Sequence, residues 1–143
     1  MSETVQVFID GASSGNPGPA GIGVVFVNAQ GVTLARLYKY IGETTNNVAE
    51  YLALVYALQE ALARGWIVLA VKTDSELLAK QLNGSYKVRD PLLRLFHDVA
   101  SHVRSCLKSC TIEHISRTLN TQADRLATEA VESRFDTSLK VVD

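Results

Sequence analysis

Residues 5–11 hold the pattern that most limits how this chain can fold. Every position from 5 to 9 is apolar except Gln6, which is typical of a central strand covered on both faces. Asp10 ends the run and is followed at once by Gly11 and a turn-rich segment. Core packing does not readily explain an acid at the end of a buried strand. A site to which other acids contribute explains it better.

Length and composition favour one globular domain. The chain has 143 residues, of which 47% are hydrophobic and 20% charged, a balance that argues against disorder. Its net charge of −1 weakens any case for strong non-specific binding to nucleic acid, although it leaves room for a local basic strip. Residues 135–143 show no clear periodicity. We therefore expect a domain over residues 1–134 and a loosely held tail.

The sequence shows no targeting or membrane signal. Its first residues form neither a basic region nor an apolar signal segment, and no apolar run approaches the length of a membrane span. Cys106 and Cys110 are not accompanied by further ligands at zinc-site spacing, which favours reduced structural thiols. We therefore expect a soluble cytoplasmic protein with no membrane partner.

Periodicity and turn residues predict an α/β protein. Three successive strands joined by short turns form an antiparallel meander, and the later strands alternate with helices. That order is typical of a mixed sheet with helices on its faces. The predicted strands cover residues 5–10, 22–27, 32–40, 66–73 and 111–115, and the predicted helices cover 48–64, 75–82, 92–107 and 120–132.

Two features predict close packing of helices on this sheet. From residue 48 to 58 only Glu50 is neither apolar nor aromatic, so this helix is expected to be covered on more than one side. Gly21 and Gly23 flank the start of the second strand, where glycine favours a bulge or the close approach of another backbone segment.

Four acids lie at the ends of predicted elements, and three of them have an ordinary structural explanation. Asp10 and Asp74 both end apolar strands, but Asp74 also fits the N-cap of the helix that follows it. Glu50 fits a capping box with Asn47, and Asp124 complements the dipole of the last helix. If the two strands are parallel neighbours, Asp10 and Asp74 lie side by side at the edge where such sheets bind ligands.

Convergence of all four acids would require a cation, because unpaired carboxylates repel one another. Oxygen ligands suit hard divalent cations, and Mg²⁺ in particular keeps waters and binds substrate phosphate oxygens. Two such ions about 3.5–4 Å apart activate a water and stabilise the leaving oxygen of a phosphodiester. The acids alone leave this hypothesis and the separate structural explanations open.

Four segments together resemble the motif set of type 1 ribonuclease H, in the order of that family. The resemblance covers residues from about 5 to 130 and implies a five-stranded ribonuclease H fold for the domain over residues 1–134. It also implies Mg²⁺- or Mn²⁺-dependent endonucleolytic hydrolysis of the RNA strand of RNA–DNA hybrids, with two ions in the site, 5′-phosphate and 3′-hydroxyl ends, and no obligatory protein partner. The segments are DGASSGNPGPAG at 10–21, TNNVAEY at 45–51, TDS at 73–75 and NTQADRLA at 120–127.

The resemblance assigns roles to residues of the four segments. Carboxylates of the family motif hold the metal ions, whereas amide and hydroxyl side chains hold the RNA backbone and its 2′-hydroxyls. Thr45 is also expected near a DNA phosphate. The implied metal ligands are Asp10, Glu50, Asp74 and Asp124, and the implied substrate-binding residues are Asn16, Thr45, Asn46 and Asn47.

Two departures place the chain with the shorter, archaeal-like branch of that family. The basic insertion of the bacterial branch is missing, so Lys87 and Arg89 are either a reduced phosphate contact or part of a solvated loop. The His-bearing loop before the last acid is also missing. Arg117 resembles the arginine of the shorter branch and is expected at the scissile phosphate or in product release, whereas His114 is expected to be a packing or surface residue.

Two other functions are compatible with the same fold. One is a non-catalytic module that binds hybrid or RNA, which would not need four acids near phosphates. The other is a different nuclease of the ribonuclease H-like superfamily, such as a transposase-type or junction-resolving enzyme. The cluster of residues 45–47 and Asn16 favours a reader of the RNA 2′-hydroxyl over a DNA-only nuclease.

Overall fold

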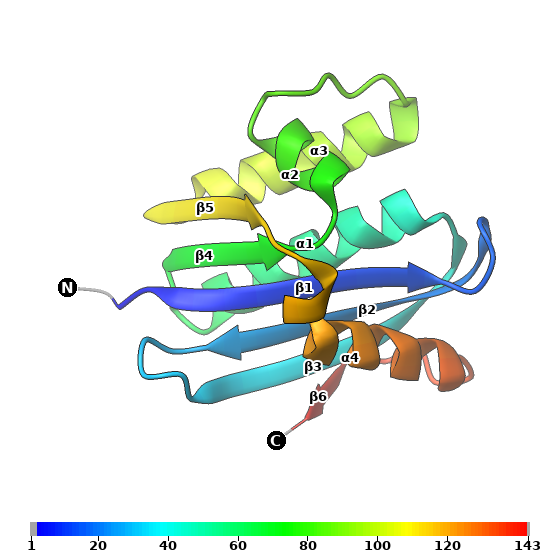
Figure 1. The fold of residues 1–143 in the computed structure, drawn as a ribbon, viewed down its shortest axis with the longest axis horizontal. Helices are drawn as coiled ribbons and strands as arrows, with labels where there is room; N and C mark the ends of the chain where they lie inside the picture. The colour runs from blue at the N-terminus through cyan, green and yellow to red at the C-terminus, as the bar shows by residue number, and fades with distance from the viewer. Residues whose placement is uncertain (1–2, 143) are drawn as a thin grey trace.

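The central strand of the sheet is the strand that the apolar pattern predicts. The computed structural model describes residues 3–142, and within them the chain forms a six-stranded sheet in the order β5-β4-β1-β2-β3-β6 (Figure 1). Val7 and Ile9 of the central strand are fully buried, as a strand covered on both faces requires. The strands are β1 (Val5–Ser13), β2 (Gly18–Val27), β3 (Thr33–Thr44), β4 (Val68–Thr73), β5 (Ser109–His114) and β6 (Lys140–Val142).

Strand pairing confirms the predicted mixed sheet. β1, β2 and β3 pair antiparallel as a meander, whereas β4 runs parallel to β1 and β5 runs parallel to β4. The sheet has six strands instead of five, because Lys140–Val142 of the tail pairs antiparallel with β3. A strand of three residues is too short to show the alternation by which longer strands are recognised.

Helices cover both faces of the sheet. α1 packs on β1 and β2 and also against α3, which confirms that its apolar surface is covered on more than one side (Figure 1). α4 lies on the opposite face, over β1, β2 and β3. No helix within residues 3–142 combines the length and apolar character needed to cross a membrane. The helices are α1 (Asn46–Ala63), α2 (Glu76–Leu82), α3 (Pro91–Ser105) and α4 (Thr121–Glu132), with a 3₁₀ turn η1 (Arg117–Leu119) before α4.

Close approach of α4 to β2 depends on glycine. A Cβ atom at Gly23 would lie 2.2 Å from the carbonyl oxygen of Ala123, and one at Gly21 would lie 2.5 Å from that of Ala127. The β2–β3 register also shifts between Ala20 and Gly21. Both the predicted close approach of another backbone segment and the predicted bulge are therefore confirmed.

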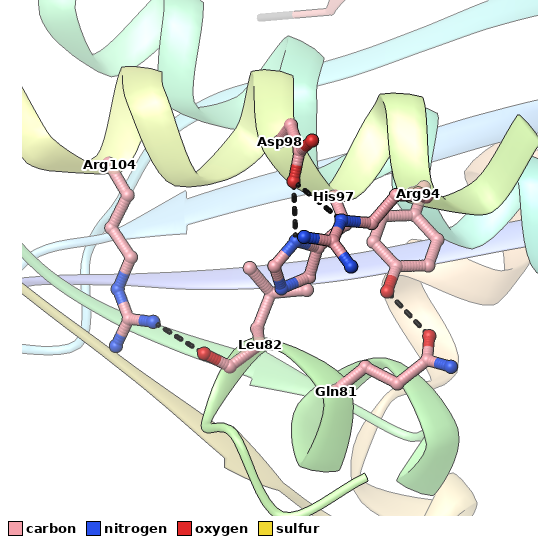
Figure 2. Close-up of polar contacts among 7 residues, drawn as sticks. Gln81, Leu82, Arg94, His97, Asp98 and Arg104 are labelled. Carbon is pink, nitrogen blue, oxygen red and sulfur yellow. Dashed lines mark hydrogen bonds and ion pairs between the residues drawn. The ribbon is translucent and has the colours of Figure 1, made fainter. Parts of the chain in front are cut away.

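Polar contacts fix α2 between α3 and β5. The Arg104 guanidinium of α3 donates to the Leu82 carbonyl at the end of α2 (Figure 2). It also donates to the Cys110 carbonyl in β5. The buried hydroxyl of Tyr51 in α1 donates to Gln81 Oε1 at 2.5 Å. These bonds hold α2, and with it the β4–α2 turn that carries Asp74.

Candidate active site

Asp10 and Asp74 lie side by side at the carboxyl edge of the sheet. Ile9 pairs with Thr73 in the parallel β1–β4 ladder, so the next residue in each case, Asp10 within β1 and Asp74 directly after β4, occupies the same level. The N-cap of α2 is Ser75, whose hydroxyl accepts from the Leu78 N–H at 3.1 Å. The explanation of Asp74 as that cap is therefore wrong.

Glu50 is held by β1 and not by its own helix. The Gly11 N–H donates to Glu50 Oε1 at 2.5 Å. The N-cap of α1 is Thr45, whose hydroxyl accepts from the Val48 N–H at 3.2 Å, so the capping box with Asn47 is not formed. Gly11 permits this contact, because a Cβ atom there would lie 2.3 Å from the backbone of Ala49.

The four acids line one groove. Carboxylate oxygens of Asp10, Glu50 and Asp74 all lie within 4.8 Å of one another. Asp124, in the first turn of α4, lines the same groove and contacts the Asp10 carboxyl. The groove has a volume of about 340 Å³ and is lined by Asp10, Gly11, Ala12, Ser13, Asn46, Asn47, Glu50, Asp74, Ser75, Arg117 and Asp124.

The electrostatics of the groove fit a cation. Burial and the nearby carboxylates of Glu50 and Asp74 raise the pKa of Asp10, which is only 5% exposed, to about 10. Burial raises the pKa of Glu50 to about 7, although the Gly11 N–H opposes that shift. Glu50 Oε2 is buried and has no hydrogen-bond partner within the described part of the chain. A divalent cation would neutralise the ionised carboxylates of the groove and would give Glu50 Oε2 a partner.

Side chains of the predicted RNA-binding set surround the N-terminus of α1. The Asn46 N–H donates to Asn16 Oδ1 at 3.0 Å, and the Ser13 N–H donates to Asn46 Oδ1 at 3.0 Å. These bonds fix the β1–β2 loop to α1. Asn46 and Asn47 line the groove, whereas Asn16 reaches it through Asn46, and the Thr45 hydroxyl caps α1.

Of the three basic residues that the sequence links to phosphates, one lines the groove and two do not. Arg117 of η1 lines the groove and is exposed. Lys87 and Arg89 are exposed in the loop between α2 and α3, outside the groove and at the margin of the molecule (Figure 1). His114 pairs with Thr73 in the β4–β5 ladder, is exposed and interacts with Glu76 of α2. It does not line the groove.

Gly11 is a residue whose part in the site the sequence pattern does not show. Its N–H orients Glu50, and its lack of a side chain admits the first turn of α1. Beside Asp10 in a turn-rich run, it has the pattern of an ordinary turn glycine. A turn glycine and a glycine that holds Glu50 have the same local pattern. They differ only in the contact with Glu50, which lies 39 positions away in the sequence.

Known proteins match this chain over most of its length. A family model described as reverse transcriptase-like matches residues 8–130, a range that contains all four acids. The class defined by fold and site is therefore that of the reverse transcriptase-like proteins.

Individual relatives narrow this class. Ribonuclease HI of Halobacterium salinarum is 41% identical over 128 residues, which are 90% of this chain and 64% of that protein. The crystal structure of RNase H1 from H. salinarum matches with a TM-score of 0.89 at 40% identity, over 91% of this chain and 98% of that one. LC11-RNase H1 in complex with RNA/DNA hybrid matches with a TM-score of 0.87 at 39% identity, over 92% and 99%. The chain belongs to the type 1 ribonuclease H family.

The chain spans only part of some curated relatives. It covers 64% of the halobacterial protein and 36% of the bifunctional protein Rv2228c of Mycobacterium tuberculosis, to which it is 41% identical over 130 residues, or 90% of this chain. These relatives therefore contain segments beyond the part that matches this chain.

Proposed function

We propose that the protein is an endoribonuclease that hydrolyses the RNA strand of RNA–DNA hybrids. The observation that carries the proposal is the gathering of Asp10, Glu50, Asp74 and Asp124 in one groove of a type 1 ribonuclease H fold. The hybrid-bound structure of LC11-RNase H1, at 39% identity, supports hybrid as the substrate class. Hydrolysis by a two-metal mechanism would leave 5′-phosphate and 3′-hydroxyl ends.

The four acids would hold two Mg²⁺ or Mn²⁺ ions. When bound, such ions lower the pKa of an attacking water and neutralise charge on the leaving oxygen. The chain itself fixes the ligand directions, because the Gly11 N–H occupies Glu50 Oε1 and leaves Oε2 without a partner. Asp10 interacts with each of the other three acids, so its carboxylate would lie at the centre of the ligand set.

Amide side chains beside the acids would select RNA. Asn46 and Asn47 line the groove next to Glu50, and Asn16 is bonded to Asn46. An amide both donates and accepts hydrogen bonds, as the 2′-hydroxyl does. The Arg117 guanidinium would pair with the scissile phosphate or the product, Thr45 would lie near a DNA phosphate, and Lys87 with Arg89 would add a weaker phosphate contact.

Asn47→Ala is expected to raise the KM for a hybrid about fivefold and to change kcat less than about twofold. The reason is that one hydrogen bond in the bound state contributes about 1 kcal/mol. Steady-state cleavage of a labelled hybrid measures both constants. Gln59→Ala, which removes an exposed amide from the same helix far from the groove, is the control. Equal KM values for the two variants would contradict the role of Asn47.

Product ends test the proposed chemistry. Hybrid with a labelled RNA strand is incubated with the protein in Mg²⁺ or in EDTA, and the fragments are analysed for terminal phosphate. We expect cleavage in Mg²⁺ alone, with 5′-phosphate and 3′-hydroxyl ends. Fragments with 3′-phosphate or cyclic phosphate, or binding of hybrid without any cleavage, would refute the proposal. Binding without cleavage would favour the non-catalytic module.

We also infer a cytoplasmic location and activity without an obligatory protein partner. Cys106 and Cys110 are free, which suits a reducing compartment. The four acids of the groove all come from this one chain. Cell fractionation and sedimentation of the active protein test these two inferences, and a requirement for a second protein in the cleavage assay would contradict the latter.

A further inference from the structure

Asn120 is a buried polar residue that links α4 to the central strand. Its side chain is 1% exposed, and its Nδ2 donates to the Ile9 carbonyl at 2.8 Å across a separation of 111 residues. Ile9 directly precedes Asp10. The bond therefore connects the start of α4 to the backbone of β1 next to the acid at the centre of the groove.

The side chain of Asn120 does not cap its own helix. Asparagine before a helix ordinarily accepts a hydrogen bond from one of the first free N–H groups of that helix. Asn120 precedes α4, yet its side chain makes no such bond, and its Oδ1 is buried without a partner within the described residues. An unsatisfied buried acceptor is unfavourable. Asn120 thus gives up a local stabilising contact and makes a long-range one.

Backbone bonds of Asn120 extend the link to two groove residues. Its N–H donates to the Arg117 carbonyl at 3.0 Å, and its own carbonyl accepts from the Asp124 N–H at 3.1 Å. Residues 113–119 are exposed or half-buried, and η1 contains no buried residue. Asn120 is therefore the first buried residue after β5, and it anchors the C-terminal end of the segment that carries Arg117.

We propose that Asn120 is a positioning residue that fixes Asp124 and Arg117 relative to Asp10. The inference rests on the proposed function, because it gives Asn120 its effect through residues assigned to the metals and the phosphate. When Asp10 and Asp124 are both ionised, their mutual repulsion favours separation of β1 from α4 at this point. The bond from Asn120 to Ile9 opposes that separation at the residue adjacent to Asp10.

Asn120→Ser tests the proposal while preserving the helix. Serine is a good N-cap but is too short to reach the Ile9 carbonyl. We expect kcat for hybrid cleavage to fall about 10- to 100-fold, with KM within about threefold, because residues that orient metal ligands have effects of this size. Calorimetric titration with Mn²⁺ should show about tenfold weaker binding in the step that Asp124→Asn also weakens.

Asn83→Ser is the matched control. Asn83 Nδ2 donates to the Ile112 carbonyl at 2.9 Å, so this variant also loses a long-range bond from an asparagine to a strand, away from the groove. Its kcat and Mn²⁺ affinity should equal those of the wild type. Asn120→Asp, which keeps the side-chain shape and replaces the donor, serves as a second variant and should show the same reduction in kcat.

The outcomes separate this inference from the proposed function. If the wild type cleaves hybrid, and both Asn120 variants match Asn83→Ser in kcat and Mn²⁺ affinity, the positioning role is overturned and the function stands. If the wild type does not cleave hybrid, the function is refuted, and the Mn²⁺ titration still decides on Asn120. A lower Tm with unchanged kcat and Mn²⁺ affinity also overturns the inference, since it indicates a purely structural role.

Discussion

Asp10→Asn is expected to abolish metal-dependent cleavage and to raise the Tm of the metal-free protein. Asparagine keeps the shape of the side chain and removes an ionisable group that is buried beside Glu50 and Asp74. It also supplies N–H donors to the neighbouring carboxylates. We expect kcat to fall by at least about 10³-fold, because the central ligand of the proposed metal site is lost.

The buried Asp10 carboxyl also determines how the free energy of unfolding changes with pH. Burial and the neighbouring carboxylates raise the pKa of Asp10 from its ordinary 3.8 to about 10. Between these values the folded protein binds more protons than the unfolded chain, so the free energy of unfolding falls as the pH rises. Near pH 7 the loss is on the order of 2–4 kcal/mol, and its removal corresponds to a rise in Tm of roughly 5–10 °C.

Thermal melts in EDTA between pH 5 and pH 9 measure this difference. The wild type should lose stability as the pH rises, Asp10→Asn should depend on pH less, and Mg²⁺ should stabilise the wild type more than the variant. Asp98→Asn is the control, because Asp98 is an exposed acid whose pKa is lowered by His97 and Arg94. A variant at Asp10 that melts below the wild type in EDTA, or that cleaves hybrid at full rate, would contradict the assignment.

Gly23→Ala is expected to destabilise the fold by about 3 kcal/mol or more. The added Cβ would lie 2.2 Å from the Ala123 carbonyl oxygen and 2.7 Å from the Ala127 nitrogen, and both are backbone atoms that cannot move aside. α4 would have to shift away from β2, and its first turn carries Asp124. Cleavage of hybrid should therefore fall together with the midpoint of urea unfolding.

Gly31→Ala distinguishes the steric overlap of an added Cβ atom from the strain of a left-handed backbone conformation. Gly31 has φ of +82°, and a Cβ atom added there would meet no other atom within 4 Å. Alanine at this position therefore costs only the left-handed conformation, about 1 kcal/mol. We expect this variant to cleave hybrid at the wild-type rate. If the two variants lose equal stability, the close contact between α4 and β2 is not the reason for glycine at position 23.

Periodicity was sufficient to predict the elements that build the core. The apolar run before Asp10 identified the central strand, and the uniformly apolar segment of residues 48–58 indicated a helix covered by both the sheet and α3. The three-residue strand β6 was not predicted, since so short a segment carries no period.

The site could be predicted only in part, because its decisive contacts are non-local. Local spacing suggested that Glu50 caps its helix and that Asp74 caps the next, yet Glu50 is bound by Gly11 and the cap of α2 is Ser75. Asn120 is a similar case, since its pattern indicates a helix start and its side chain binds Ile9. The resemblance to a family predicts a shared role for the four acids, and the register of β1 with β4 explains why two of them are adjacent.

Cleavage of three matched duplexes tests the central claim most directly. A hybrid, an RNA duplex and a DNA duplex of one sequence are incubated with wild type and with Asp10→Asn, in Mg²⁺ and in Mn²⁺. We expect the wild type to cut the RNA strand of the hybrid in at least one of the two metals and to leave the DNA duplex intact, and Asp10→Asn to cut nothing. Cleavage of the DNA duplex at a rate similar to that of the hybrid, or full activity of Asp10→Asn, would contradict a metal-dependent ribonuclease site centred on Asp10.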